Sequence, residues 1–99
     1  MPRVFVAQKS LGKNLTPALE YGDVVIIFEA LESVSDDLLR CMAYARLTMK
    51  DFTKNDYIIA MGSPVAMIAV ALVAEEKTGG PFKLLEWDKQ TFKYRVVQF

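Results

Sequence analysis

The sequence has no histidine and only one cysteine, Cys41, among its 99 residues. Without histidine, the chain lacks the usual base for a serine or cysteine nucleophile, the commonest zinc ligand and the usual proton shuttle at neutral pH. A lone cysteine cannot form a disulfide within the chain, which agrees with a reducing, intracellular location. Cys41 stands beside Met42 in a helical pattern, so we interpret it as a small core residue rather than a nucleophile. These absences predict no catalytic residue, no metal site and no cofactor.

Long apolar runs are also absent. The longest covers residues 65–74, ten residues in all, about half of the ~20 that a membrane-spanning helix needs. The first residues lead directly into strand-like sequence, without the extended apolar region of a secretory signal. We therefore expect a protein that has no membrane partner.

Neither sign of charge is in excess, since 12 Lys and Arg residues balance 12 Asp and Glu residues. The charges are nevertheless grouped along the chain. Residues 1–19 carry the cations Arg3, Lys9 and Lys13 with no acid, whereas residues 20–39 carry six acids and no base. A nucleic-acid interface needs Lys and Arg gathered on one face, so this pattern disfavours DNA and RNA as partners.

Apolar side chains are what the sequence has in excess. They make up 53% of the chain before its five glycines are counted, compared with ~45–50% in soluble domains with glycine included. At this length we expect one domain, residues 1–99, with one small core. Apolar surface left over after that core is filled predicts self-association, most simply as a homodimer.

Strand and helix patterns alternate along the chain. Apolar runs predict strands at residues 3–8, 23–28 and 56–61, and the later two lack the alternation of a half-exposed strand. Thr16 as N-cap with Pro17 behind it predicts a short helix that Gly22 ends. Ser35, followed by two aspartates, predicts the start of a longer helix that ends near Phe52. Residues 82–99 predict a hairpin with its turn at 88–91.

A further helix is predicted by the Gly62-Ser63-Pro64 turn. Ser63 suits the N-cap and Pro64 the first helical position, while Gly79 suits the left-handed end. Residues 65–74 are apolar on every side, which predicts a helix buried all round.

This order of elements predicts an α/β fold, a small Rossmann-like sandwich of two or three layers. Its central strands are parallel with right-handed crossovers, and the C-terminal hairpin adds an antiparallel edge. Because neither run alternates and each is linked to a helical pattern, residues 24–28 and 57–61 are predicted to lie side by side.

Candidate ligand-binding residues follow from the rule that open α/β sheets bind ligands beyond the carboxyl ends of their strands. Six residues fall at that edge or in a loop beside it: Gln8, Lys9, Lys13, Glu29, Gly62 and Ser63. The helix that begins at Ser63 would present free N–H groups to an anion. The alternative, which we favour, is that Ser-Pro simply begins a helix. Residues 9–14 depart from the phosphate-loop pattern, since Asn14 stands where the magnesium-binding hydroxyl belongs.

The C-terminal hairpin supplies the candidate interface residues. Its last residues, 96–99, form a poorly guarded strand edge, and the interface candidates are Trp87, Tyr94, Val97 and Phe99. For Trp87 and Tyr94 a place in the core is the alternative, and it is the favoured one.

Four motifs resemble a known family in their order and spacing. They are Leu-Thr-Pro-Ala-Leu-Glu-Tyr-Gly at residues 15–22, Phe-Thr before Asp-Tyr-Ile-Ile at 52–59, Gly-Ser-Pro at 62–64, and Phe-Lys-Leu-Leu-Glu-Trp-Asp-Lys-Gln at 82–90 with Tyr94 close behind. The chain resembles, over nearly its whole length, a family of small uncharacterised proteins recurrent in tailed bacteriophage genomes. The family pattern commonly has Asp or Asn at the position of Ser63 and a glycine at the start of the following helix. These departures count against a small-molecule site that needs close backbone approach at this turn.

The resemblance implies a phage origin and action in the host bacterial cytoplasm, but no activity. We therefore favour a phage accessory protein that acts non-enzymatically through a protein surface, by self-association or by binding a host protein. The alternative is a binding module or small hydrolase for a nucleotide or another anionic ligand at the carboxyl edge of the sheet.

Overall fold

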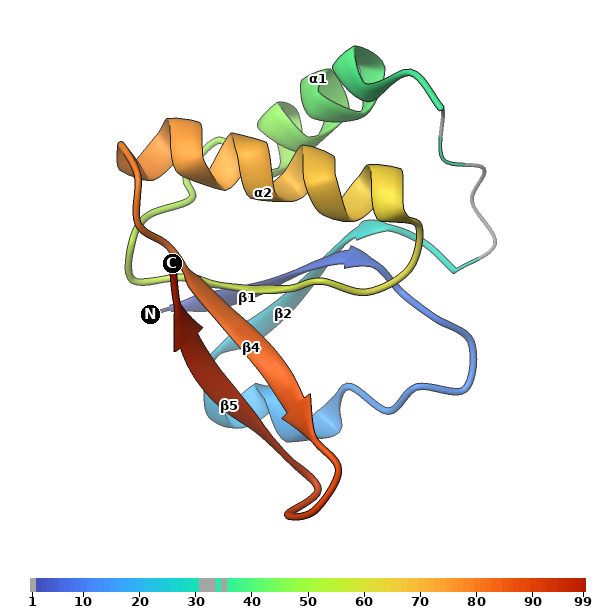
Figure 1. Ribbon diagram of the computed structural model, residues 1–99, viewed down its shortest axis with the longest axis vertical. Coiled ribbons are helices and arrows are strands. Elements are labelled where there is room, and N and C mark those ends of the chain that lie inside the picture. Colours follow the sequence, from blue (N-terminus) through green and yellow to red (C-terminus); the bar gives the residue numbers. More distant parts are fainter. Residues whose placement is uncertain (1, 31–33, 35) are drawn as a thin grey trace.

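The computed structural model describes residues 2–30, 34 and 36–99 of the chain. Within these residues a five-stranded sheet has two α-helices on one face and a 3-10 helix, η1, on the other (Figure 1). The elements follow one another as β1 (Arg3–Gln8), η1 (Thr16–Glu20), β2 (Asp23–Phe28), α1 (Leu38–Thr48), β3 (Tyr57–Ile59), α2 (Pro64–Thr78), β4 (Lys83–Asp88) and β5 (Lys93–Gln98).

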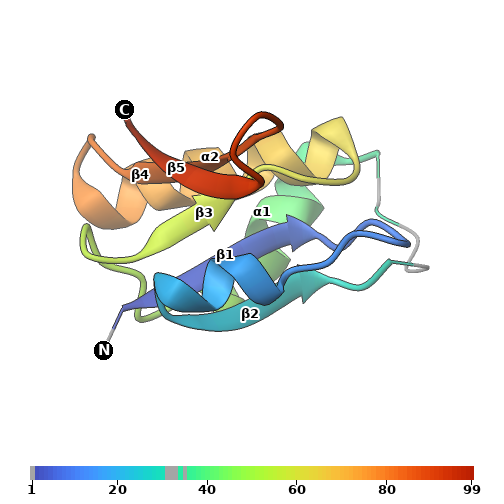
Figure 2. The same cartoon turned by 90° about the horizontal axis from the view of Figure 1, so that it is seen from below.

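The strand order is β2-β1-β3-β4-β5. Strands β1 to β4 are parallel, and β4 pairs with β5 as an antiparallel hairpin. Figure 2 shows the sheet from the side that carries η1. The α/β class, the parallel central strands and the C-terminal hairpin are confirmed.

The central strand of the parallel part is β1, whose residues 4–7 are completely buried. It pairs with β2 on one side and β3 on the other. The prediction that residues 24–28 and 57–61 lie side by side is therefore wrong, because β1 separates them and β2 is an edge strand. A continuous apolar run indicates that a strand is covered, but it does not identify the strand's neighbours.

Two apolar clusters lie on opposite faces of the sheet. The larger, around Phe5 and Ile58, packs beneath α1 and α2. The smaller, around Val6 and Leu85, includes Ala18 of η1. Because η1 has only five residues, it covers the second face much less completely than the two α-helices cover the first.

Helix α1 begins at Asp37, whose carboxylate accepts a hydrogen bond from the N–H of Leu39 (3.1 Å). The predicted start, Ser35, lies outside the described residues. The predicted apolar residues Met42, Ala45, Met49 and Phe52 are buried. However, the helix ends at Thr48, before the predicted end near Phe52, so the last two of them lie in the chain that follows it.

Helix α2 begins and ends as predicted. The hydroxyl of Ser63 accepts a hydrogen bond from the N–H of Val65 (3.2 Å), and Gly79 adopts the left-handed conformation at φ +78°. However, the prediction that this helix is buried on every side is wrong, since the side chains of Ile68 and Leu72 are 53% and 38% exposed. The helix packs against the sheet and α1, and its far side faces outward.

The segments at Thr16 and residues 56–61 differ from expectation in detail. The chain after Asn14 forms a 3-10 helix whose N-cap is Leu15, and the N–H of Thr16 donates to Asn14 Oδ1 (3.0 Å). Strand β3 has only three residues, fewer than the six predicted.

Candidate functional site

The predicted anion site at the start of α2 is filled by a side chain of the same protein. Gln8 Oε1 accepts a hydrogen bond from the N–H of Ser63 (2.8 Å), and Gln8 Nε2 donates to the carbonyl of Glu29 (3.3 Å). A Cβ at position 62 would lie 2.4 Å from the Cβ of Gln8, so only glycine allows this close approach. The carboxamide of Gln8 thus joins the carboxyl ends of β1, β2 and β3.

The structure brings five of the six candidate ligand residues together at this edge. Gln8 contacts Glu29, Gly62 and Ser63, and Lys9 directly follows Gln8, with its N–H donating to the Phe28 carbonyl (3.0 Å). Lys13 is separate, because it lines a cavity on the η1 side of the sheet. Binding of an anion at Ser63 remains a prediction, and it would require Gln8 to give up a hydrogen bond.

That cavity, which we call the fork, opens where β3 and β4 part. Its volume is about 770 Å³, within the ~300–1,000 Å³ of typical ligand sites. Strands β3 and β4 pair only at residues 57–58 and 83–84, after which β4 continues with β5 alone. The fork is lined by the loop before η1 (Gly12, Lys13, Asn14), by the end of β3 (Ile59, Ala60, Met61) and by the hairpin (Leu85, Glu86, Trp87, Phe92, Tyr94).

Aromatic side chains form the hairpin wall of the fork. The rings of Trp87 and Tyr94 meet edge to face with centroids 5.0 Å apart. The hydroxyl of Tyr21 donates to the Tyr94 carbonyl (2.8 Å). Burial raises the pKa of both tyrosines, and the neighbouring Glu20 raises that of Tyr21 further. Both phenols are therefore neutral at physiological pH, and the phenol of Tyr21 acts as a hydrogen-bond donor rather than a base.

The fork is not apparent in the sequence, although three of its residues were predicted separately to have a role. Lys13 was assigned to the anion site, and Trp87 and Tyr94 to an interface or the core. Tyr94 is buried, as favoured, whereas Trp87 is 38% exposed. Nothing in the sequence indicated the fork, because the apolar run at residues 56–61 predicted a longer strand, whereas β3 ends at Ile59 and leaves β4 without a partner beyond that point.

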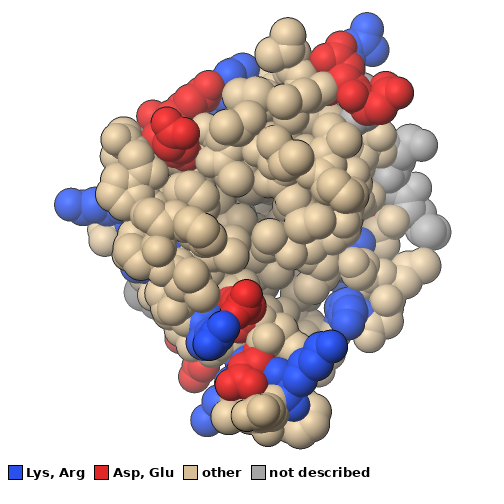
Figure 3. All heavy atoms as spheres, in the orientation of Figure 1, with Lys and Arg blue, Asp and Glu red and all other residues tan. Residues whose placement is uncertain are grey.

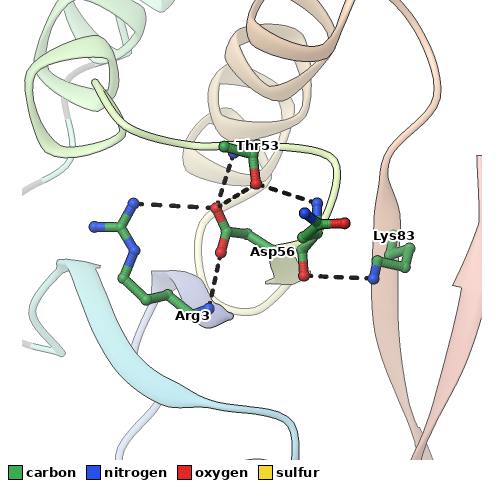
Figure 4. Close-up of polar contacts among 5 residues, drawn as sticks. Arg3, Thr53, Asp56 and Lys83 are labelled. Carbon is green, nitrogen blue, oxygen red and sulfur yellow. Dashed lines mark hydrogen bonds and ion pairs between the residues drawn. The ribbon is translucent and has the colours of Figure 1, made fainter. Parts of the chain in front are cut away.

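A second polar cluster lies at the opposite end of β1 and β3 (Figure 4). Asp56 is only 4% exposed, and its carboxylate accepts hydrogen bonds from the backbone N–H groups of Arg3 and Thr53, each at 2.8 Å. The guanidinium of Arg3 approaches the same carboxylate at 4.0 Å. Nearby, the ammonium of Lys83 donates to the Asn55 carbonyl (3.4 Å). Since every group in this cluster has a partner, we interpret it as a clamp that holds the loop before β3.

Cys41 is buried at 2% exposure, as predicted for a core residue. Burial raises the pKa of its thiol, and the acidic residues Asp37 and Asp36 raise it further. A raised pKa lowers the thiolate fraction and therefore the nucleophilicity at neutral pH.

Residues 2–30, 34 and 36–99 contain no group of three or more His, Cys, Asp or Glu side chains placed to hold a metal ion. None of the helices described here has the length and apolarity to cross a membrane.

The remaining interface candidates lie at the end of the sheet. Val97 is half-buried and Phe99 is 59% exposed, with the Phe99 ring stacked on that of Phe82 at 5.5 Å. Figure 3 shows this side of the molecule, where an uncharged surface extends from α2 toward the hairpin and charged residues lie around its margin.

The comparisons with known proteins identify a family. The searches of curated proteins and of solved structures each gave no match. The sequence model for the phage Pam3 gp32-like protein matches residues 2–99, which is nearly the whole chain and agrees with the resemblance in its four motifs. The chain therefore belongs to the phage Pam3 gp32-like protein family.

Proposed function

We propose that this phage protein acts non-enzymatically through protein contacts in the host bacterial cytoplasm, and that its first partner is a second copy of itself. The observation that carries the proposal is the open edge of β5, next to the uncharged surface of α2. A host protein is the further partner that such an accessory protein would bind.

The hydrogen-bond pattern identifies the free groups on β5. Phe82 and Phe99 exchange both backbone hydrogen bonds at 2.9 Å, so theirs is a hydrogen-bonded pair of the antiparallel ladder. Because such pairs alternate along the strands, the backbone groups of Val96 and Gln98 point away from β4. Strand β5 is the last in the sheet, so these groups are available to another strand.

The side chains favour one pairing of β5 with its copy. A two-fold axis beside Arg95 would place two guanidinium groups directly opposite each other, which is destabilising. An axis at Val97 instead pairs Val96 with Gln98 of the second copy and makes four backbone hydrogen bonds. This arrangement leaves the Tyr94 carbonyl with Tyr21 and brings Arg95 beside the Phe99 ring of the second copy, where a cation–π contact is favourable.

Such pairing would also cover apolar surface on the helix side of the sheet. Ile68 and Leu72 of α2 are exposed, and β5 contributes Val97 and Phe99 to the same side. A two-fold axis perpendicular to the sheet keeps both copies of α2 on one face. The apolar groups that the monomer exposes would then flank the new contact.

The test measures mass in solution by light scattering after size-exclusion chromatography. Wild type is expected to be a dimer at high micromolar concentration. Val96→Pro removes an outward N–H without removing a bond to β4, so it is expected to be monomeric with an unchanged circular dichroism spectrum. Val96→Thr keeps the N–H and the branched shape, and should remain dimeric. A monomeric wild type, or a dimer that tolerates proline, would contradict the proposal.

A further inference from the structure

The fork combines apolar walls with backbone groups that have no partner. Trp87 occupies a position of β4 that alternates with the hydrogen-bonded pairs to β5, so its N–H and C=O face the β3 side. No residue of β3 pairs with β4 beyond Ile58 and Leu84. Across the fork, Ala60 makes no backbone hydrogen bond with any described residue. Two stretches of chain therefore present strand-like donors and acceptors to one cavity.

Charge in the fork is unbalanced in favour of one cation. The carboxylate of Glu86 is held by the guanidinium of Arg95 through two hydrogen bonds. Lys13, which lines the opposite wall, has no ion pair with a described residue. An occupant with one acidic group would complement the fork better than a neutral or basic one.

We propose that the fork binds an extended segment of another polypeptide, whose backbone hydrogen-bonds to the open side of β4 and whose acidic side chain meets Lys13. Strand addition of this kind takes its affinity from backbone hydrogen bonds and its specificity from pockets for alternate side chains. Met61 and Trp87 would contact the apolar side chains of the segment. The inference shares with the proposed function only the premise of protein contacts, since it uses a surface other than the edge of β5.

Backbone geometry favours a polypeptide over a phosphate ligand. A phosphate needs several donors directed at one point, whereas the fork presents one lysine and backbone groups spread along a strand.

The test uses Trp87, which is the only tryptophan in the chain and therefore reports directly on the fork. Peptides would be selected against the purified protein from a library of randomised dodecapeptides. Enriched sequences are expected to alternate apolar residues and to share an acidic residue. Titration with an enriched peptide should shift Trp87 emission to shorter wavelength as water leaves the fork.

Two charge-reversal variants distinguish peptide binding in the fork from binding elsewhere on the surface. Lys13→Glu is expected to weaken peptide binding by about tenfold, and a peptide with Lys in place of its acidic residue should recover affinity for this variant. Lys9→Glu makes the same charge change in the same loop but outside the fork, so affinity should stay within about twofold of wild type.

The proposal is overturned if no sequence is enriched, or if enriched peptides leave Trp87 emission unchanged. It is also overturned if Lys13→Glu and Lys9→Glu weaken binding equally. Peptide binding by a monomeric wild type would support the fork while contradicting pairing through β5, so the two proposals fail independently.

Discussion

At the scale of single residues, the most constrained position is Gly62. Its φ of +91° lies in the left-handed region, and a Cβ there would meet both the Cβ and the carbonyl oxygen of Gln8, at 2.4 and 2.8 Å. Gln8 in turn needs this proximity to accept from the N–H of Ser63. One glycine thus allows three strand ends to share a single carboxamide.

We predict that Gly62→Ala destabilises the fold much more than Gly79→Ala does. Both glycines have positive φ, but a Cβ at Gly79 meets nothing within 4 Å. Backbone strain alone costs about 1–2 kcal/mol, and overpacking adds about 1–3 kcal/mol. Urea unfolding should therefore give a loss of about 2–5 kcal/mol for Gly62→Ala and about 1–2 kcal/mol for Gly79→Ala. Equal losses would show that Gln8 moves aside at little cost.

A substitution at Ser63 also distinguishes the protein-surface proposal from the alternative of anion binding at the start of α2. Ser63→Asp keeps an effective N-cap, so we predict nearly unchanged thermal stability. Because the N–H of Ser63 already donates to Gln8, we also predict no thermal stabilisation of either protein by a panel of phosphates and nucleotides. If wild type were stabilised and Ser63→Asp were not, the anion site would be supported and the protein-surface proposal weakened.

At the scale of elements, α1 and α2 are joined by an exposed ion pair. The guanidinium of Arg46 donates two hydrogen bonds to the carboxylate of Glu76, at 2.7 and 2.9 Å. The hydrogen bond from Arg46 is the main cause that lowers the pKa of Glu76, and burial opposes it. Since the folded pKa lies below the unfolded value, the pair stabilises the fold above about pH 4.5. That contribution is lost as pH falls through the folded pKa.

We therefore predict a pH-dependent effect of Glu76→Gln. The variant should have a lower urea midpoint than wild type at pH 7, and the difference should be smaller at about pH 3, because the Glu76 carboxylate is protonated to a greater extent there. Glu75→Gln is the matched control, because Glu75 is the preceding exposed residue and has no ion pair with a described residue. Its midpoint should follow that of wild type at both pH values. A Glu76→Gln difference that is equally large at low pH would exclude the ion pair as its cause.

The ends of a helix could be predicted from the sequence where residues close together in the chain determine them. Ser63, Pro64 and Gly79 mark the ends of α2 because capping involves only nearby backbone groups. The position of β1 between β2 and β3 was not predictable, because strand order depends on contacts between residues far apart in the sequence. The exposure of Ile68 was missed for the same reason, since apolar composition does not reveal how many layers cover a helix.

At the scale of the whole molecule, several large apolar side chains of this apolar-rich chain are exposed at the surface. Leu39 and Leu47 of α1 are 72% and 76% exposed, and Phe92 of the hairpin turn is 71% exposed. The sequence indicated that such surface would remain, but not where. The fork could not be predicted, because it results from β3 ending early while β4 continues with β5.

The register of the proposed dimer can be tested by cross-linking between its two β5 strands. With the axis at Val97, the two copies of this residue form a non-hydrogen-bonded pair with Cα atoms about 4.5 Å apart, within the ~4.4–6.8 Å that a disulfide spans. Val97→Cys should therefore oxidise to a covalent dimer on a non-reducing gel. The native thiol of Cys41 is buried and its pKa is raised, so it should contribute little to the product.

Val96→Cys is the matched control for this register. In the same arrangement Val96 faces Gln98 of the second copy, so two cysteines at position 96 would not meet and the variant should stay monomeric on the gel. The reverse result, with Val96→Cys cross-linked and Val97→Cys not, would move the axis by one residue and require the Tyr94 carbonyl to accept from the second copy as well as from Tyr21. If neither variant cross-links while wild type is dimeric in solution, the copies associate through another surface, and the exposed leucines of α1 would be the next to substitute.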